Sequence, residues 1–322
     1  MRAPAFWTQP GLIPTLLRPL GLLWAGAGAW RQARTRPWRA PVPVICIGNL
    51  IMGGAGKTPV AMALAQRLQG HGHHPHLLSR GYGGKLKGPL RVDPSHHTAQ
   101  EVGDEPLLLA KAAPCWIAHD RKAGILSAAA AGADLIILDD GFQNPGVAKD
   151  FSFIVIDHGY GFGNGEVFPA GPLREPAARG LARADAVILL GEGAELPLPP
   201  ELPRLEARFA VTAAPPLGGK RVLAFAGIGR PAKFYATLAD QGALIAATRD
   251  FADHHPYRPE EVASLIEEAS KAEALPVTTE KDWVRLPEAL RDRVAKVEIA
   301  VEWADEAALD RLLLSLESNP RN

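Results

Sequence analysis

The stretch from Pro41 to Pro59, with the sequence PVPVICIGNLIMGGAGKTP, constrains the fold of this chain most. It begins with an apolar, β-branched run from Val42 to Ile47, passes through several glycines, and enters a helical pattern from Val60 to Leu68. Glycine has no Cβ atom, so a loop rich in it can bring backbone N–H groups close to phosphate oxygens. The positive N-terminal end of the following helix adds to that attraction. The order of strand, glycine loop and helix therefore predicts a polyphosphate site.

We interpret this loop as an ATP site, because Lys57 can reach the outer phosphates and the Thr58 hydroxyl can ligate Mg²⁺. The usual spacing G-x-x-x-x-G-K-S/T requires glycine at position 51, where this chain has Ile51, so the loop fits the shorter form GGxGKT. The residues expected to bind the nucleotide here are Gly53, Gly54, Ala55, Gly56, Lys57 and Thr58. A glycine-rich turn that binds no nucleotide is the alternative.

Length and composition limit the number of domains and the classes of protein that this chain can belong to. A chain of 322 residues with 47% hydrophobic content can bury a sizeable core and predicts about two domains. Lys+Arg and Asp+Glu both number 35, so the overall charge gives no indication of a nucleic-acid partner. Cys46 and Cys115 are too few for a disulfide framework and lie in apolar runs, which favours a reducing compartment. No obligate protein partner is indicated.

The N-terminal segment combines an apolar run, Leu12 to Trp30, with arginines and no acidic residue in residues 1–40. At about 1.5 Å per residue, a helix there would nearly span a hydrocarbon core of about 30 Å. Internal prolines and glycines argue against a helix that spans the membrane. No small-residue cleavage site follows, which argues against a secretory signal peptide. We therefore expect an amphipathic helix that lies in the membrane interface, with tryptophans and arginines at the headgroups. The alternative is a helix that packs on the protein's own core. The arginines are Arg2, Arg18, Arg31, Arg34, Arg36 and Arg39.

Polar residues follow an apolar strand predicted from Ala133 to Leu138. Asp139 and Asp140 come directly after it, where enzymes with such a phosphate loop hold Mg²⁺ directly or through water. Further along, Glu175 can complete the metal shell and Arg174 can clamp a phosphate bidentately. The alternative for the two aspartates is that they only cap the following turn.

A third pair of acids, Asp104 and Glu105, precedes a helical run, where acidic residues usually complement the helix dipole. A catalytic role for Asp104 depends on the C-terminal sequence Asp253-His254-His255. These side chains have no suitably spaced third ligand, which disfavours a metal site. If the second domain closes over the first, His254 can hydrogen-bond Asp104 and bias it toward accepting a proton.

The order of elements predicts an α/β fold: a P-loop NTPase-like, mostly parallel sheet with helices on both faces, followed by a smaller C-terminal α/β domain. We place a membrane-associating segment at 1–40, the P-loop kinase domain at 41–203, and a connector with a C-terminal α/β lid domain at 204–322. The strand Ala186 to Leu190 is expected to close the first sheet. The loop Gly227-Ile228-Gly229 is interpreted as a structural turn, because it lacks the third glycine of a dinucleotide site.

These motifs resemble, in order and over nearly the whole chain, those of the tetraacyldisaccharide 4′-kinase family, the lipid A 4′-kinases of outer-membrane biosynthesis. Besides the Trp/Arg-rich N-terminus, the resemblance is carried by APVPVICIGNLIMGGAGKTP, SRGYGG, GDEP, LDDGFQ, FGNG, PAGPLRE, FAGIGRP, FADHHPY and TEKDWVR. The chain departs from the family at Asn144, where a histidine commonly follows LDDGFQ.

The resemblance implies phosphoryl transfer from MgATP to the 4′-hydroxyl of a tetraacylated disaccharide 1-phosphate, giving lipid IV-A. It places the enzyme at the cytoplasmic face of the bacterial inner membrane. It also implies that Asp104 and His254 act as a catalytic dyad beside Lys57, and that Lys281, in TEKD, lies near the adenine. Candidates for contact with the lipid disaccharide are Arg80, Tyr82, Arg121, Gln143 and Arg174.

Two other classes of protein remain open. A nucleotide switch of the metallochaperone or GTPase kind could use the same loop and Asp139-Asp140, although the sequence shows no guanine-reading NKxD-type motif. A membrane-recruited scaffold with an inactive nucleotide fold is difficult to reconcile with Lys57, Thr58 and both acid pairs. With γ-labelled ATP, a lipid kinase would transfer the label to lipid and a nucleotide switch would release it into water. An inactive scaffold would leave the label on ATP.

Overall fold

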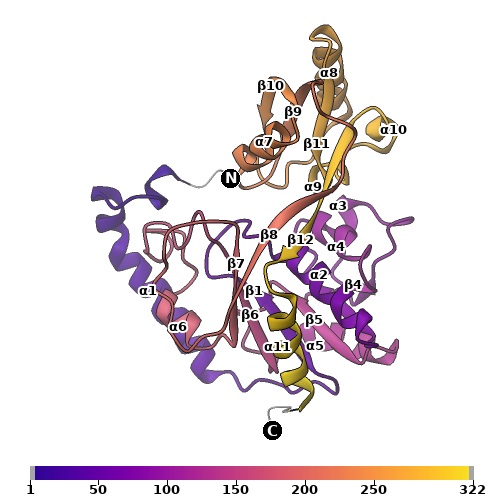
Figure 1. The fold of residues 1–322 in the computed structure, drawn as a ribbon. Helices are drawn as coiled ribbons and strands as arrows, with labels where there is room; N and C mark the ends of the chain where they lie inside the picture. The colour runs from indigo at the N-terminus through magenta and orange to yellow at the C-terminus, as the bar shows by residue number, and fades with distance from the viewer. Residues whose placement is uncertain (1–3, 319–322) are drawn as a thin grey trace.

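Within residues 4–318, which are those that this computed structural model describes, one sheet of twelve strands runs through the molecule. Its order is β10-β9-β11-β12-β8-β7-β6-β1-β5-β2-β4-β3. Figure 1 shows a layered lower body with α1 along one side and a smaller unit above it. The predicted α/β fold with a mostly parallel sheet is confirmed. Residues 1–3 and 319–322, and with them Arg2, lie outside the described range.

The lower body is a parallel sheet covered by helices on both faces. Its central strands are buried along their whole length, as expected of continuous apolar runs in a covered parallel sheet. The parallel strands are β1 (Val44–Gly48), β2 (Pro75–Ser79), β4 (Cys115–Ile117), β5 (Leu135–Asp139), β6 (Phe151–Asp157) and β7 (Ala186–Leu190); β3 (Leu90–Arg91) is antiparallel at the edge. One face is covered by α2 (Lys57–Gly70), α3 (Ala99–Val102) and α4 (Asp104–Leu109), and the other by α5 (Arg121–Ala130) and α6 (Ala177–Leu181).

The sheet does not end at β7, so the expectation that residues 186–190 close it is wrong. β8 (Arg204–Ala213) pairs in parallel with β7 and in antiparallel fashion with β12 (Ala295–Trp303). The reason lies in β8 itself: Leu205 and Ala207 are buried in the core of the lower body, so its first half is a true sheet strand. Its second half continues upward as part of a two-stranded ribbon with β12 (Figure 1).

The upper unit contains the remaining strands and its own apolar clusters. β9 (Arg221–Ala226), β10 (Leu244–Asp250) and β11 (Leu275–Thr279) run parallel to the start of β12. One face carries α7 (Pro231–Asp240), and the other carries α8 (Pro259–Lys271) and α10 (Glu288–Arg291). Because β8 and β12 are antiparallel, the strands above run opposite to those below. The carboxyl ends of the two sets of strands therefore point toward each other, and α9 (Glu280–Trp283) lies between them.

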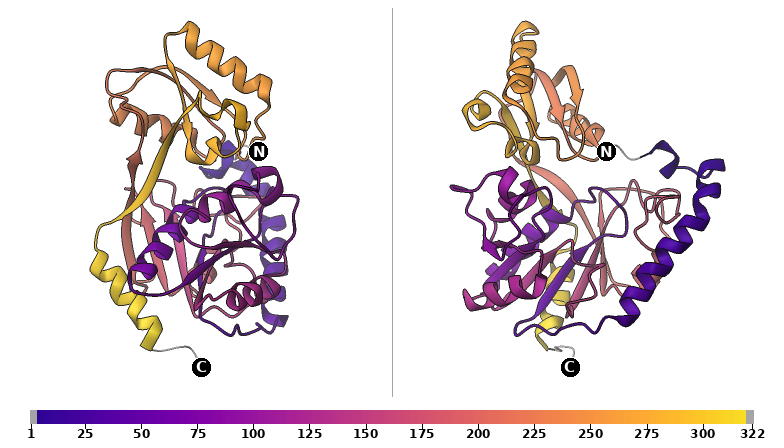
Figure 2. Two further views of the ribbon diagram at one scale, coloured as in Figure 1. Left: turned by 90° about the vertical axis from the view of Figure 1, so that its right-hand side faces the viewer. Right: turned by 180° about the vertical axis from the view of Figure 1, so that it is seen from behind.

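The last helix, α11 (Glu306–Ser318), returns to the lower body and packs on α2, where Leu309 and Leu313 are buried (Figure 2). Arg67 of α2 binds Asp310 through Nη2 at 2.5 Å and Glu306 through Nη1 at 2.7 Å. The chain thus leaves the lower body along β8 and comes back along β12. The division into domains at residues 203 and 204 stays a prediction.

The N-terminal helix α1 (Leu12–Arg34) follows a short 3₁₀ turn, Ala5–Trp7, and docks on the loop after β6. Its contact face is narrow and made of small residues: a Cβ atom at Gly21 would lie only 2.9 Å from the carbonyl oxygen of Val167. Arg18 binds Glu166 beside this contact at 2.6 Å. Most of the larger apolar side chains are exposed instead. They are Leu12, Ile13, Leu16, Leu20, Leu22, Leu23 and Trp30. Trp24 is also partly exposed, but its ring packs on Phe168 at a centroid distance of 5.1 Å.

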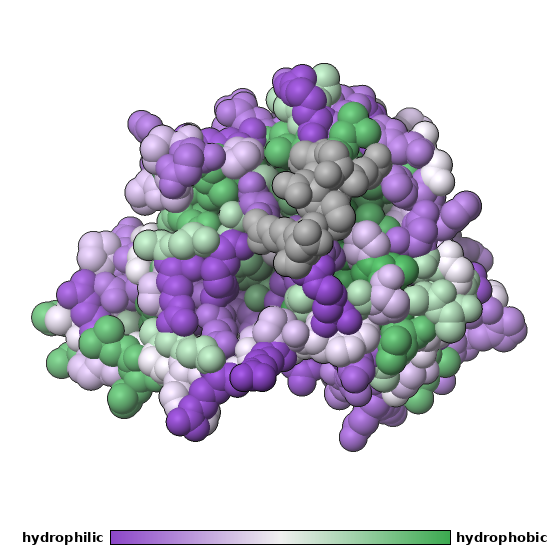
Figure 3. All heavy atoms as spheres, turned by 90° about the horizontal axis from the view of Figure 1, so that it is seen from below, coloured by the Kyte–Doolittle hydropathy of each residue, from purple (hydrophilic) through white to green (hydrophobic). Residues whose placement is uncertain are grey.

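The helix α1 packs on its own protein and still exposes a broad apolar surface, so its attachment to a membrane interface stays a prediction. Figure 3 shows hydrophobic side chains on the side of the molecule where α1 lies, at the left of the view. Among the described helices, α1 alone is long and apolar enough to cross a membrane, a criterion of length and composition only. An exposed apolar surface of this kind marks an interaction site.

The core of the lower body predicts a large effect of one substitution. Phe153 in β6 is fully buried and packs on Phe151 at a ring distance of 4.6 Å. We expect Phe153→Ala to lower the free energy of unfolding by about 3–5 kcal/mol, because the cavity left behind cannot collapse fully. Urea unfolding followed by circular dichroism measures this. The control Leu126→Ala, at a side chain that is 45% exposed, should change stability by about 0.5 kcal/mol or less. Equal midpoints for Phe153→Ala and wild type would contradict the expectation.

Candidate active site

The glycine loop connects β1 to α2 at the carboxyl edge of the lower sheet, as predicted. Gly56 immediately precedes α2 with φ of +85°, a left-handed conformation that favours glycine. A Cβ atom there would also lie 2.5 Å from Leu190 Cδ1 and 2.7 Å from Phe209 Cζ. Asn49 Nδ2 donates to the carbonyl oxygen of Gly53 at 3.3 Å and braces the loop. The sequence thus needs glycine at this position both for the backbone and for the neighbouring side chains.

Two of the predicted metal ligands meet directly. The Thr58 hydroxyl donates to Asp139 Oδ2 at 3.1 Å, and both side chains are buried. Asp139 Oδ1 is buried without a hydrogen-bond partner within the described residues. Burial raises the pKa of Asp139, the charge of Glu105 raises it further, and Lys57 opposes this. A buried carboxylate oxygen without a partner fits a position at which a cation would bind.

The other two predicted ligands are occupied by arginines. Asp140, with φ of +57°, accepts two hydrogen bonds from Arg174, from Nη1 at 2.9 Å and Nη2 at 3.1 Å. Glu175 binds Arg183 at 2.8 Å and Gln143 at 3.3 Å. No group of three or more His, Cys, Asp or Glu side chains in residues 4–318 is arranged to hold a metal. The assignment of all four residues to one metal shell stays a prediction.

Arg174 has a different place from the phosphate clamp that was expected. Besides Asp140, its Nε donates to the carbonyl oxygen of Ile51 at 3.1 Å, inside the glycine loop. Lys57 Nζ lies 3.8 Å from Asp140 Oδ1. Arg174 thus ties the loop to the end of β5, and Asp140 is a shared anion for Arg174 and Lys57. Gln143 Nε2 adds a bond to the carbonyl oxygen of Asn49 at 2.9 Å.

Asp104 and His254 come together across the two facing sheet edges, as the sequence predicted. His254 Nδ1 lies 2.9 Å from Asp104 Oδ2 and 3.1 Å from Oδ1. Asp104 is only 3% exposed, and burial alone would raise its pKa. The hydrogen bond from His254 and the charges of Lys281 and Arg285 outweigh burial and bring the pKa of Asp104 down to about 2. The carboxylate is therefore ionised at neutral pH.

Lys281 lies beside this pair. Its Nζ is 3.1 Å from Glu105 Oε1, 3.4 Å from His254 Nε2 and 3.9 Å from Asp253. Although burial lowers it, the pKa of Lys281 is raised overall by Glu105, Asp104 and Asp253. An ammonium can only donate, so His254 Nε2 accepts and the ring proton is on Nδ1, directed at Asp104. These contacts do not support the placement of Lys281 near the adenine, which stays a prediction.

The remaining predicted contacts lie around the same edge. Tyr82 is 67% exposed and its ring lies edge-on to His254, with centroids 5.3 Å apart. Arg80 is exposed, whereas Arg121 is buried, donates to the carbonyl oxygen of Ala118 at 2.7 Å, and has a pKa lowered by burial and by Arg80. Asn144 accepts from the N–H of Gly146 at 2.8 Å and shapes its own turn.

Sequence reasoning missed a second set of contacts between the upper unit and the lower body. The Gly227–Arg230 loop lies on the glycine loop: a Cβ atom at Gly229 would lie 3.5 Å from the amide nitrogen of Gly54. Asp157, at the end of β6, binds Lys233 Nζ at 2.6 Å and Arg230 at 2.9 Å. FAGIGRP was identified as a motif, but no pattern in it indicated that Arg230 would bind Asp157, which lies 73 residues earlier in the chain.

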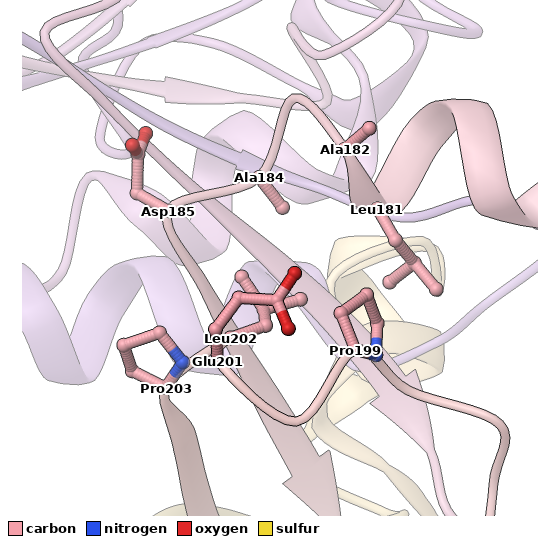
Figure 4. A pocket seen from close by; sticks show the side chains of 8 residues that line it. All are labelled: Leu181, Ala182, Ala184, Asp185, Pro199, Glu201, Leu202 and Pro203. Atoms are coloured by element: carbon pink, nitrogen blue, oxygen red, sulfur yellow. The ribbon is translucent and has the colours of Figure 1, made fainter.

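A separate pocket of about 280 Å³ lies away from this site (Figure 4). It opens beside the start of β7 and β8, at the opposite end of those strands from the glycine loop. Its lining combines apolar residues with Asp185 and Glu201; the lining residues are Leu181, Ala182, Ala184, Asp185, Pro199, Glu201, Leu202 and Pro203. None of the predicted site residues lines it.

The sheet order and the glycine loop are those of a P-loop phosphotransferase, and a carboxylate and an imidazole meet between the two sheet edges. A family model described as tetraacyldisaccharide-1-P 4′-kinase matches residues 13–317. The chain belongs to this family of lipid kinases. It is therefore an ATP-dependent enzyme whose phosphate acceptor is an alcohol group.

Individual relatives agree with the family. A tetraacyldisaccharide 4′-kinase from Rhodospirillum centenum is 56% identical, with 99% of this chain and 97% of the relative covered. One from Gluconacetobacter diazotrophicus is 54% identical over 97% of both chains. The fold is similar to a crystal structure of LpxK from Aquifex aeolicus in complex with ATP, with a TM-score of 0.75 and 27% identity over 95% of this chain and 99% of that one. The nucleotide-switch and scaffold alternatives gain no support from these relatives.

The carboxylate of Asp104 makes stability depend on pH. Its pKa is about 2 in the folded protein, below the ordinary value of 3.8, so ionisation stabilises the folded state above about pH 4. At about 1.4 kcal/mol per pKa unit this amounts to about 2 kcal/mol, and it is lost as the pH falls from about 4 toward about 2. We expect Asp104→Asn to be less stable than wild type near neutral pH and the difference to shrink in that window. Urea unfolding of both proteins tests this, and a difference independent of pH would contradict it.

Proposed function

We propose that this chain transfers the γ-phosphoryl group of ATP to the 4′-hydroxyl of a tetraacylated disaccharide 1-phosphate, giving lipid IV-A. The observation that carries the proposal is the pairing of Asp104 with His254 at 2.9 Å, between the carboxyl edge that bears the glycine loop and the edge of the upper unit. The names of the relatives identify the substrate class for those proteins, and this chain is 56% and 54% identical to two of them over nearly its full length.

The phosphate end of the reaction uses the glycine loop. Its N–H groups and the start of α2 would hold the phosphates, and Lys57, which now lies 3.8 Å from Asp140, would neutralise the outer ones. Thr58 and Asp139 would hold Mg²⁺, since both are buried together and Asp139 Oδ1 has no other partner within the described residues. Bound Mg²⁺ would neutralise charge that develops on the phosphates. Asp140 and Glu175 are less suited, because Arg174 and Arg183 already bind them.

Asp104 would act on the acceptor. The acceptor oxygen attacks the γ-phosphorus as its proton passes to Asp104, and the bond from the γ-phosphorus to the bridging oxygen breaks, which leaves ADP. His254 donates a hydrogen bond from its Nδ1–H to Asp104 and so orients the carboxylate. Lys281 donates to Nε2 of the same ring and so keeps the ring proton on Nδ1. Most of the catalytic effect then comes from positioning and charge neutralisation.

The lipid would approach along α1. Trp24 Nε1 donates to the carbonyl oxygen of Arg174 at 3.1 Å, and Arg31 donates to that of Gln143 at 3.2 Å. The helix with the exposed apolar surface is therefore in contact with loops that carry two candidate sugar-binding residues. Acyl chains held beside α1 would present the disaccharide to this edge, where Arg80, Tyr82 and Arg121 are further candidates for contact. This supports peripheral or monotopic attachment to the cytoplasmic face of the inner membrane.

The dyad assignment predicts the effect of Asp104→Ala. Turnover should fall by about 10²–10⁴-fold with little change in KM for ATP, because the group acts on the acceptor and not on the nucleotide. The assay follows the γ-label of ATP into a detergent-dispersed disaccharide lipid. Glu195→Ala, at an exposed carboxylate elsewhere, serves as the control. Near-normal turnover of Asp104→Ala beside an inactive Lys57→Ala would overturn the base assignment, and label in water alone would overturn the acceptor.

The exposed surface of α1 predicts membrane binding. Leu16, Leu20 and Leu23 are all exposed and their spacing places them on one face of the helix. We expect the triple change of these residues to Glu to reduce sedimentation with anionic phospholipid vesicles about tenfold or more. Stabilisation by ATP in thermal unfolding should be kept, which verifies that the triple variant folds. Leu126→Glu is the matched control, since Leu126 is an exposed leucine outside α1. Unchanged vesicle binding of the triple variant would exclude α1 as the attachment surface.

A further inference from the structure

A fully buried carboxylate, Asp282, organises the underside of the upper unit. Its Oδ1 accepts hydrogen bonds from the N–H of Gly227 at 2.7 Å, from the Tyr257 hydroxyl at 2.8 Å and from Arg285 at 2.5 Å. Its Oδ2 accepts from the Thr279 hydroxyl at 2.5 Å. A charge buried this deeply persists only when it is paired and hydrogen-bonded. Asp282 thus joins the ends of β9 and β11 to the segment that follows His254.

Arg285 is the cation that pairs with Asp282, and its guanidinium is equally buried. Its Nη2 also donates to the carbonyl oxygen of Gly227 at 2.9 Å, and its Nη1 donates to that of His255 at 3.2 Å. The backbone N–H of His254 donates to the same Gly227 carbonyl at 3.2 Å. Arg285 therefore holds the loop directly at His255 and, through the carbonyl group of Gly227, at His254.

The same guanidinium reaches across to the lower body. Arg285 Nε lies 3.4 Å from Asp104 Oδ2, the oxygen that also receives the bond from His254. His254 itself has φ of +58°, a conformation that is uncommon for a residue other than glycine and that its surroundings must maintain. One planar cation thus contacts both the carboxylate of the pair and the loop that carries the imidazole.

We propose that Arg285, anchored by Asp282, is a positioning residue that holds Asp104 and His254 at the distance and orientation needed for proton transfer. The inference rests on the proposed function and adds to it a group that acts through the dyad. A guanidinium suits this task because its donors lie in one rigid plane and can bind several acceptors at once, whereas an ammonium is a point charge.

The charges around Asp104 give Arg285 a second effect. Asp104 is faced by His254, Lys281 and Arg285 from the upper unit, with Glu105 beside it on α4 and Asp253 behind Lys281. Burial raises the pKa of Asp104, and Arg285 is one of the three groups that lower it. Arg285 thus also helps to keep the carboxylate ionised while it is enclosed.

The test compares Arg285→Lys, which keeps the buried charge but cannot bridge its partners, with Arg285→Met, which removes the charge. We expect kcat to fall about tenfold or more for Arg285→Met and by a smaller factor for Arg285→Lys, with KM for ATP changed by about twofold or less. Stabilisation by ATP in thermal unfolding verifies that each variant folds. Arg291→Met is the matched control, because Arg291 also binds two carbonyl oxygens, those of Leu286 and Val284, but contacts neither Asp104 nor His254.

A second set of variants separates positioning from general support of the fold. In an Asp104→Asn background, Arg285→Met and Arg285→Lys should cause little further loss of kcat, since the group through which Arg285 acts is already gone. A purely structural role would lower kcat by the same factor in both backgrounds and would overturn the proposal. If Arg285→Met does not fold, the same comparison with Arg285→Lys decides.

The outcomes also separate this inference from the proposed function. If Asp104→Asn keeps normal turnover, the base assignment fails and the role of Arg285 fails with it. If Asp104→Asn is impaired while both Arg285 variants keep wild-type kcat, only the positioning role is refuted.

Discussion

The antiparallel pairing of β8 with β12 is the interaction on which the rest of the structure depends. In a sheet that stayed parallel throughout, all loops that bind ligands would lie along one edge. Here, apart from the short antiparallel edge strand β3, the strand direction reverses at the ribbon of Arg204–Ala213 with Ala295–Trp303, and two such edges face each other. The phosphate loop comes from one edge and His254 from the other. Functional residues that are 150 positions apart in the chain therefore meet.

Most of the polar contacts that join the two edges are between charged groups. Asp157 binds Arg230 and Lys233, Glu105 binds Lys281, and Lys111 binds Glu280. Apart from Val284 and Trp283, which join the apolar cluster of the lower body, the apolar clusters lie within the lower body or within the upper unit. Ion pairs near a surface contribute little net free energy and weaken in salt. The ion pairs between the two edges therefore set their relative position, while the free energy needed to separate the edges stays small.

Much of the fold could be read from the sequence because its strongest patterns are local. Continuous apolar runs gave the buried strands, and the order of strand, glycines and helix located the phosphate loop. Asp104 and His254 were paired only with the help of the family resemblance. What could not be predicted was long-range: β8 was not recognised as a sheet strand, since its burial depends on the lower body, and the bond of Arg174 to Asp140 was not foreseen. The role of Asp282 had no signal beyond its place in a motif.

The return of α11 to α2 has a consequence for how the molecule can move. The upper unit is held by both of its chain connections, which leave and re-enter the lower body side by side. Such a double tether permits flexing of the ribbon but resists free rotation. Bending of the ribbon would move Gly229 away from Gly54 and His254 away from Asp104 at the same time. Nucleotide exchange would then occur while Asp104 is separated from His254. ATP that enters at that stage would not be hydrolysed by water before the acceptor binds.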